Sequence, residues 1–266
     1  PQATLEDVQV VREELGLDKP IHEQYITYVT GLLKGDLGTS LRTKRPVAVE
    51  VSNRYANTAK LTLLALAWST IVGVLLGVWS GRHRSRWQDY TGMTLAVSGI
   101  SLPSFWVGFM LIMVFSVNLK WFPTTGADSL KSLVLPSIAL GSSIAAIIAR
   151  FTRSSIIEVL KDDYIRTARA KGLRERVVVW KHAFRNAMIS VVTVVGLQFG
   201  FLLGGSVVTE SVFAFPGLGS LLVESVNYRD YPAIQSLILI FSLHFVVINL
   251  IVDVLYAVLN PEIQLD

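Results

Sequence analysis

The sequence predicts an all-α membrane protein with five visible transmembrane helices, and its composition and charge distribution support this. Hydrophobic residues make up 52% of the 266 residues, whereas charged residues make up only 17%. Soluble domains usually carry about 25% charged residues. The charges also leave five uncharged stretches, and each can cross a bilayer, which requires about 20 residues. These stretches are residues 61–81, 90–119, 132–149, 186–209 and 231–252.

The residues before the first stretch, 1–57, are expected to form helical structure outside the membrane. One helix is expected over residues 4–16 and another over residues 20–35, because each has apolar residues at helical spacing and a glycine at its end. Residues 35–46 have the composition of turns. Residues 47–60 are then expected to form a helix that leads into the membrane.

The second and third stretches contain prolines. The second is longer than one crossing needs and includes Pro103, which predicts a kinked or broken helix. Such a break can line a transport pathway, or it can be a simple kink with no transport role. The third stretch is interrupted by Pro136 and Gly141 and is the weakest of the five, but we count it as a span.

The fourth stretch carries Gly196, Gly200 and Gly204 at intervals of four, so they share one face of a helix. This face can serve close helix packing or can line a moving pathway. The four histidines of the chain are scattered, and the chain has no cysteine. The sequence therefore predicts no metal site.

The loop charges predict how the chain is oriented in the membrane. Residues 82–86 carry three arginines, and residues 150–185 carry ten basic against four acidic residues. Cytoplasmic loops are enriched in basic residues, so both loops are expected in the cytoplasm. This places the amino-terminal region outside and the tail, residues 261–266, inside. An odd number of spans with an external amino terminus also suggests that one further span precedes Pro1.

Residues 162–172, within a cytoplasmic loop spanning residues 150–187, have the features of a short, self-contained helix. Two aspartates suit its amino end, Arg169 and Lys171 suit its carboxyl end, and Gly172 can adopt the left-handed conformation that ends a helix. Small side chains leave the helix thin enough to enter a groove on another protein. From charge alone, a solvated loop or a contact with anionic lipids remains an alternative.

Several sequence blocks resemble a known family. IRTARAKG and KHAFRNA are similar to the cytoplasmic EAA loop of ABC-importer permeases of the dipeptide, oligopeptide and nickel group. GLDKP, GDLGTS, ESVFAFPGLG, RDYP and NLIVD also resemble signatures of that group, in the same order. The resemblance covers essentially the whole chain, although Arg166 and Thr167 stand where the generic motif has Glu and Ala.

The resemblance implies the fold of a type I importer transmembrane domain, here over residues 58–260. It implies a coupling helix that docks on a separate ATPase and an external re-entrant turn near the mouth of the path. The coupling residues would be Tyr164, Arg166, Thr167, Ala168, Arg169, Ala170, Lys171 and Gly172. The candidate pathway or gate residues, including those noted above, would be Pro103, Gly196, Gly200, Gly204, Glu210, Phe213, Pro216 and Gly217.

The implied function is ATP-driven import of short peptides, such as dipeptides, oligopeptides or glutathione, across a bacterial inner membrane. The implied partners are a second homologous permease, two ABC ATPase subunits, an external substrate-binding protein and membrane lipids. No nucleic acid partner is expected, because topology accounts for the basic charge. The chain has no G-x-x-x-x-G-K-[ST] loop, so ATP and Mg²⁺ would bind the partner ATPases.

The sequence also raises three other functions. Import of nickel or metal chelates is the alternative within the same family. An ion-coupled secondary transporter is an alternative of another class, with Asp253 and Glu210 as candidate titrating groups. A membrane-embedded hydrolase is disfavoured, because no span combines a nucleophile, a base and an orienting acid. We therefore expect a transport subunit rather than an enzyme.

Overall fold

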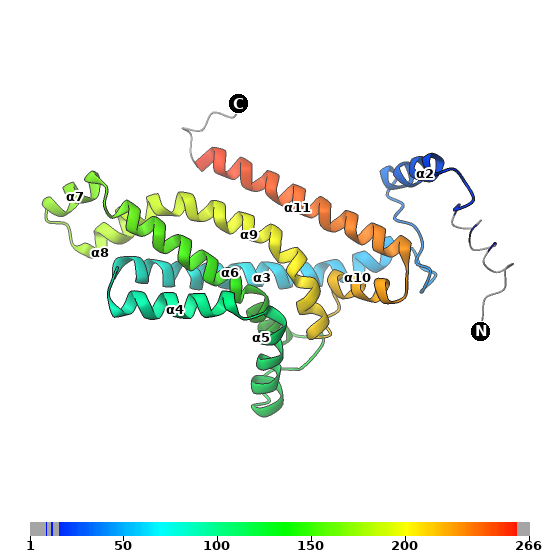
Figure 1. Cartoon of the computed structure of the whole chain (residues 1–266), viewed down its shortest axis with the longest axis horizontal. Coiled ribbons are helices and arrows are strands. Elements are labelled where there is room, and N and C mark those ends of the chain that lie inside the picture. Colours follow the sequence, from blue (N-terminus) through cyan, green and yellow to red (C-terminus); the bar gives the residue numbers. More distant parts are fainter. Residues whose placement is uncertain (1–8, 10–11, 13–15, 260–266) are drawn as a thin grey trace.

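Long helices run side by side along the long axis of the molecule (Figure 1). This computed structural model describes residues 9, 12 and 16–259. Apart from one isolated β-bridge between Thr39 and Pro46, the regular elements in these residues are helical. The helices are α2 Ile21–Leu33, α3 Val47–Arg82, α4 Trp87–Ser101, α5 Ser104–Leu111, the π-helical η1 Ile112–Asn118, α6 Leu130–Val159, α7 Asp163–Ala170, α8 Glu175–Val177, the π-helical η2 Val178–Ala183, α9 Phe184–Val212, α10 Leu218–Asn227 and α11 Tyr231–Leu259.

Four helical segments in the described part of the chain are long and apolar enough to cross a membrane. They are α3, α6, the continuous run from α8 through η2 to α9, and α11 up to Val254. The helices on either side of residues 102 and 103 pass the same test only as a pair, and they are bent by 101°. The expected five spans are therefore found if this bent pair counts as one.

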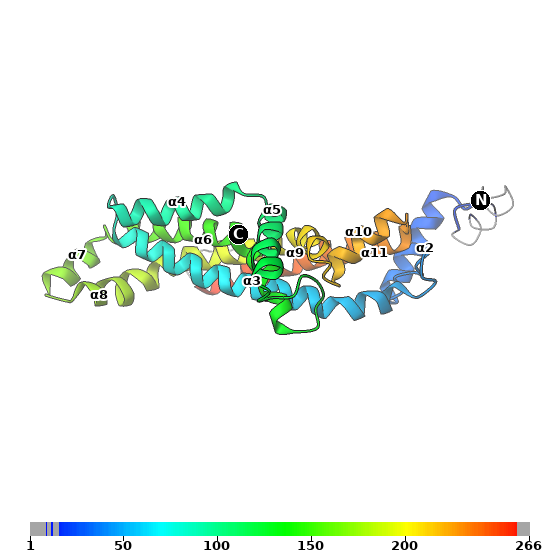
Figure 2. The same ribbon diagram turned by 90° about the horizontal axis from the view of Figure 1, so that it is seen from below.

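The bend confirms the predicted break at Pro103. Leu102 is extended, with φ −95° and ψ 128°, which is the conformation that a following proline favours. Pro103 has no N–H to donate, so the helical hydrogen bonding stops there and resumes in α5. As a result α5 projects away from the long axis in Figure 1, and it is seen nearly end-on in Figure 2.

The tightest helix packing joins α3 to α6 through glycines. A Cβ added at Gly73 would lie 2.7 Å from the Ala145 carbonyl oxygen, and one at Gly77 would lie 2.6 Å from the Ala149 carbonyl oxygen. Real Cβ atoms do not approach so closely, so only glycine allows this backbone contact.

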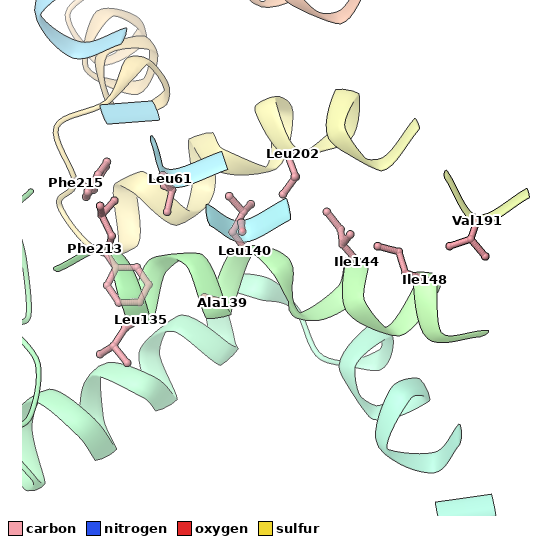
Figure 3. Close-up of a cluster of buried hydrophobic side chains, with 12 residues drawn as sticks. Leu61, Leu135, Ala139, Leu140, Ile144, Ile148, Val191, Leu202, Phe213 and Phe215 are labelled. Carbon is pink, nitrogen blue, oxygen red and sulfur yellow. The ribbon is translucent and has the colours of Figure 1, made fainter. Parts of the chain in front are cut away.

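Helix α6 lies at the centre of the main core and is the most buried of the candidate spans. The third stretch, which was the weakest span by sequence, therefore forms the central helix. Figure 3 shows apolar side chains from α3, α9 and the turn after α9 converging on α6. This cluster includes Leu61, Leu135, Ala139, Leu140, Ile144, Ile148, Val191, Leu202, Phe213 and Phe215.

Several predicted boundaries need correction. The expected helix over residues 47–60 exists but is continuous with the first span, forming the 36-residue α3. The expected loop over 150–187 is narrower, because α6 extends to Val159 and helix resumes at Glu175. Helix α10 was not predicted. The helix expected over residues 4–16 lies largely, and the tail 261–266 entirely, outside the described residues.

Candidate functional site

Helix α7 lies at one end of the molecule, between α6 and α8, with α2 at the opposite end (Figure 1). The predicted two-turn helix is present, and its residues are Asp163–Ala170. Gly172 has φ +74°, so it takes the left-handed conformation expected after the helix. Asp162 occupies the N-cap position without a side-chain hydrogen bond to the helix.

The helix has one buried and one exposed face. Ile165 and Ala168 are buried and pack against Val178 and Ala183 of η2. The Ala168 methyl therefore contacts its own chain, whereas the resemblance placed this residue on a surface for the ATPase. The other predicted coupling residues are exposed: Tyr164, Arg166, Thr167, Arg169, Ala170, Lys171 and Gly172.

Polar contacts tie α7 to the helix that follows it. Arg169 donates two hydrogen bonds to the Glu175 carboxylate, at 3.1 and 2.8 Å, and these bonds raise the pKa of the Arg169 guanidinium. Asn186 Nδ2 donates to the Tyr164 hydroxyl at 2.6 Å. Arg166 pairs with Asp163, at 3.2 Å and with both side chains exposed. The arrangement fixes α7 in place and leaves Arg166 at the surface.

A second candidate site lies around the turn after α9, where Glu210 is fully buried. Its carboxylate accepts hydrogen bonds from Thr58 Oγ1 at 2.7 Å and from the Ser220 backbone N–H at 2.9 Å. Thr58 in turn accepts from the Leu218 N–H at 2.8 Å. A side chain at Gly217 would collide with the carboxylate. Glu210 therefore joins the end of α9 to the start of α10 and to α3.

The turn between α9 and α10, residues 213–217, is held from several sides. Phe213 and Phe215 are buried in the main core. Asn57 Nδ2 donates to the Pro216 carbonyl oxygen at 2.8 Å, although Pro216 itself is exposed. The structure thus places three predicted gate residues, Phe213, Pro216 and Gly217, in this turn and the fourth, Glu210, beside it at the end of α9.

The segment before α3 is fastened to the link between α10 and α11. The buried Asp230 carboxylate accepts hydrogen bonds from the Ser40 hydroxyl and, at 3.0 Å, from the Leu41 N–H. Ser236 Oγ donates to the Leu37 carbonyl oxygen at 2.7 Å. The GDLGTS and RDYP blocks, which the sequence left unrelated, therefore form one contact.

An ionic cluster lies beside this contact, at the α2 end of the molecule. Glu224 of α10 pairs with Arg42 at 3.0 Å and with Arg54 at 3.3 Å. Partial burial by itself raises the pKa of Glu224. The hydrogen bonds and charges of Arg54, and then of Arg42, outweigh this and hold its pKa below the ordinary 4.5. Sequence reasoning missed this cluster, because Glu224 is 170 or more positions from both arginines in the chain.

The predicted pathway glycines of α9 do not gather with this turn. A Cβ at Gly196 would lie 2.6 Å from Val252 Cγ1, and one at Gly200 would lie 3.0 Å from the Phe245 ring, so both glycines face α11. Gly204 has open space in place of a Cβ. This geometry favours the packing interpretation for Gly196 and Gly200.

The described residues contain no group of three or more His, Cys, Asp or Glu side chains that could hold a metal ion. His244, in α11, lies 2.7 Å from the Ile240 carbonyl oxygen through Nδ1 and 2.6 Å from the Tyr55 hydroxyl through Nε2. Because a carbonyl oxygen only accepts, Nδ1 donates to Ile240, and in the neutral ring Nε2 accepts from the Tyr55 hydroxyl. The histidine thus links α3 to α11.

Comparisons with known proteins agree with this architecture. Residues 73–265 match the family model described as "Binding-protein-dependent transport system inner membrane component". The chain is 54% identical over 264 residues to the glutathione transport system permease protein GsiC of Escherichia coli (strain K12) and to that of Salmonella typhimurium. Each alignment covers 99% of this chain and 86% of the relative. The GsiC protein of Pectobacterium atrosepticum is 55% identical over 257 residues, covering 97% and 84%.

Solved structures support the fold. The MetNI methionine ABC transporter in an inward-facing conformation matches with a TM-score of 0.68 and 17% identity, over 79% of this chain and 96% of that chain. An amino acid ABC transporter determined with histidines matches with a TM-score of 0.62 and 16% identity, over 78% and 92%. Together with the family match, these findings show that the chain belongs to the inner-membrane components of binding-protein-dependent transport systems, as the permease subunit of an ABC importer.

Proposed function

We propose that this permease imports glutathione and similar short peptides. The observation that carries the proposal is its 54% identity, over 99% of the chain, to glutathione permeases. An ABC permease subunit is a non-catalytic membrane component, and its family implies separate ATPase and binding-protein partners. A nickel-chelate substrate is less well supported, because the relatives reported above are glutathione permeases.

The proposal includes the orientation and the partners of the subunit. The α7 end would lie in the cytoplasm, since the basic loops belong to that end, and the α2 end would face the external binding protein. A second, homologous permease would complete the path, and each permease would dock on one of two ATPases. These ATPases would bind the ATP and Mg²⁺.

The contacts of α7 support a coupling role. Its buried face packs on η2, and Tyr164 and Arg169 bond to residues in the helical run that becomes α9. A force applied to the exposed face of α7 would therefore move α9 directly rather than bend a loop. The other end of α9 carries Glu210 and the α9–α10 turn, so the same helix would carry the motion to the external gate.

The proposal is tested by uptake in proteoliposomes that contain the complete importer and receive the binding protein. Radiolabelled glutathione should accumulate only with ATP on the ATPase side, and excess unlabelled glutathione should compete. Accumulation of a nickel chelate without glutathione would replace the proposed substrate. Uptake that follows a pH gradient without ATP would instead indicate an ion-coupled transporter.

Two substitutions on α7 separate coupling from folding. Ala170→Trp enlarges the exposed face, so we expect normal thermal stability and ATP hydrolysis that no longer drives uptake. Ala168→Trp enlarges the buried face, where overpacking typically costs about 1–3 kcal/mol, so we expect a loss of stability. Normal uptake by Ala170→Trp would contradict the docking role of this face.

A further inference from the structure

The segment formed by α5 and η1, residues 104–118, leaves the helix bundle almost at a right angle. We call this segment the lateral arm. It is bent by 101° from α4, and α4 has only 15 residues. At 1.5 Å per residue α4 is about 22 Å long, which is shorter than the ~30 Å hydrocarbon core of a bilayer. If α4 starts at one membrane surface, the chain turns sideways before it reaches the other.

One side of the lateral arm packs on the protein. Val107, Leu111, Ile112 and Phe115 pack against the main core cluster. A Cβ at Gly108 would lie 3.1 Å from both the Phe213 ring and the Val212 side chain. The arm is therefore held against the α9–α10 turn, and its direction is set by the protein.

The other side of the lateral arm is an uncovered apolar stripe. The stripe consists of Phe105, Phe109, Met113 and Val117, which follow one another at intervals of four residues. Each of these residues is between 47% and 56% exposed. No charged residue occurs from residue 104 to residue 119. A stripe of this kind needs an apolar surrounding, because exposing large apolar side chains to water is unfavourable.

The flanking residues point to a lipid surface rather than to a protein groove. Trp106 and Trp121 are both exposed, and Lys120 follows immediately after the uncharged run. Tryptophan is enriched at the level of the headgroups, and lysine can extend its ammonium group from there into water. Helices that lie in this region are buried about 5–10 Å into the boundary between headgroups and acyl chains.

We propose that the lateral arm lies in the plane of the bilayer, at the headgroup boundary of the leaflet remote from the amino end of α4, with its apolar stripe on the acyl chains. The proposal rests on the chain being a membrane permease but not on its substrate. Through the Gly108 contact, the lipid surface would help to position the α9–α10 turn.

The experiment measures the depth of spin labels in the assembled importer. Because the chain contains no cysteine, single substitutions to Cys at Phe105, Phe109, Met113 and Val117 each place one labelled site in this subunit. The complex is placed in nanodiscs of phosphatidylethanolamine and phosphatidylglycerol. Accessibility of each label to oxygen and to a water-soluble nickel complex then gives its depth.

Helix α11 provides the matched control. Leu239, Leu243, Val247 and Ile251 have the same spacing on a candidate span and are also exposed. Twelve helical residues rise about 18 Å, so depths along α11 should change by a large part of that distance. The four arm labels should instead lie at one shallow depth and remain accessible to oxygen. Uptake by the labelled complexes confirms that they are folded.

Three results would overturn the proposal. A depth gradient along the arm equal to that along α11 would show that the arm crosses the membrane. Labels that are immobilised and closed to oxygen in the complex would show that a partner subunit covers the stripe. Labels as accessible to the nickel complex as one at Tyr228, which is exposed after α10 and outside the candidate spans, would place the arm in water. None of these results depends on the transported substrate.

Discussion

Replacing Thr58 with valine should disconnect the buried Glu210 from α3 without changing the shape of the site. Thr58 is almost completely buried, donates to Glu210 at 2.7 Å and accepts from the Leu218 N–H at 2.8 Å. Valine has nearly the same volume but no hydroxyl. The substitution therefore leaves one buried N–H and one carboxylate oxygen each short of a partner.

The expected loss of stability follows from these two groups. Leaving a buried polar group unsatisfied costs about 1–3 kcal/mol, so Thr58→Val should destabilise the protein by roughly 2–6 kcal/mol. Thr58→Ser keeps the hydroxyl and loses one methyl group, which is worth about 1 kcal/mol. Because the two variants differ mainly in hydrogen bonding, serine is the matched control.

The assay is thermal unfolding of the assembled importer in nanodiscs. For a chain of this size, 1 kcal/mol corresponds to about 2–4 °C in Tm, so a loss of about 4 kcal/mol should lower Tm by roughly 8–16 °C. Thr58→Ser should lower it by no more than about 4 °C. Equal Tm values for the two variants would show that the Thr58 hydrogen bonds do not hold the α9–α10 turn.

Three further predictions follow from the packing and the charges. Gly77→Val should destabilise the α3–α6 contact by at least about 1–3 kcal/mol, because its Cβ would collide with the α6 backbone. Gly204→Val, where a Cβ meets open space, should be nearly neutral, and the yield of folded complex and its Tm compare the two variants. Asp89→Asn should lower the stability of the protein by about 3 kcal/mol, because the buried Asp89 carboxylate accepts two hydrogen bonds from Arg153, at 2.6 and 2.7 Å. The double variant Asp89→Asn with Arg153→Met should have a smaller fall in Tm than Asp89→Asn alone, and an equal or larger fall would argue against this pair. Glu224 has a lowered pKa, so its stabilising contribution is present above its unfolded-state pKa and is lost as the pH falls through its folded-state pKa. On acidification from about pH 6 to pH 3.5, Tm should therefore fall less in Glu224→Gln than in the unmodified protein. Identical dependence of Tm on pH in the two proteins would exclude a role for the Glu224 ion pairs.

Much of the fold could be predicted because the membrane leaves a direct signal in the sequence. Uncharged stretches located the spans, and Pro103 predicted the break that the structure shows. The direction of the chain after Pro103 could not be predicted, because it depends on where α5 packs. The interruptions at Pro136 and Gly141 made the third stretch look like the weakest span, but α6 continues through both residues and is the most buried of the candidate spans.

The candidate sites were predicted unevenly. Residue spacing and charge located α7 and its Gly172 end, because these features are local. The faces of α7 were not predicted, so the burial of Ala168 against η2 was not foreseen. The contacts of Asp230 with Ser40, and of Glu224 with Arg42, join residues about 180 or more positions apart, and a single sequence does not report such pairs.

Cross-linking from α7 tests the central claim most directly. A single Cys at Ala170, in a chain that has no other cysteine, can carry a photoreactive group within the complete importer. We predict a covalent product with the ATPase subunit from this position, and none with the ATPase from a Cys at Leu33, which is 83% exposed on α2 at the opposite end. An ATPase product from Leu33 but not from Ala170 would contradict both the orientation and the coupling role of α7.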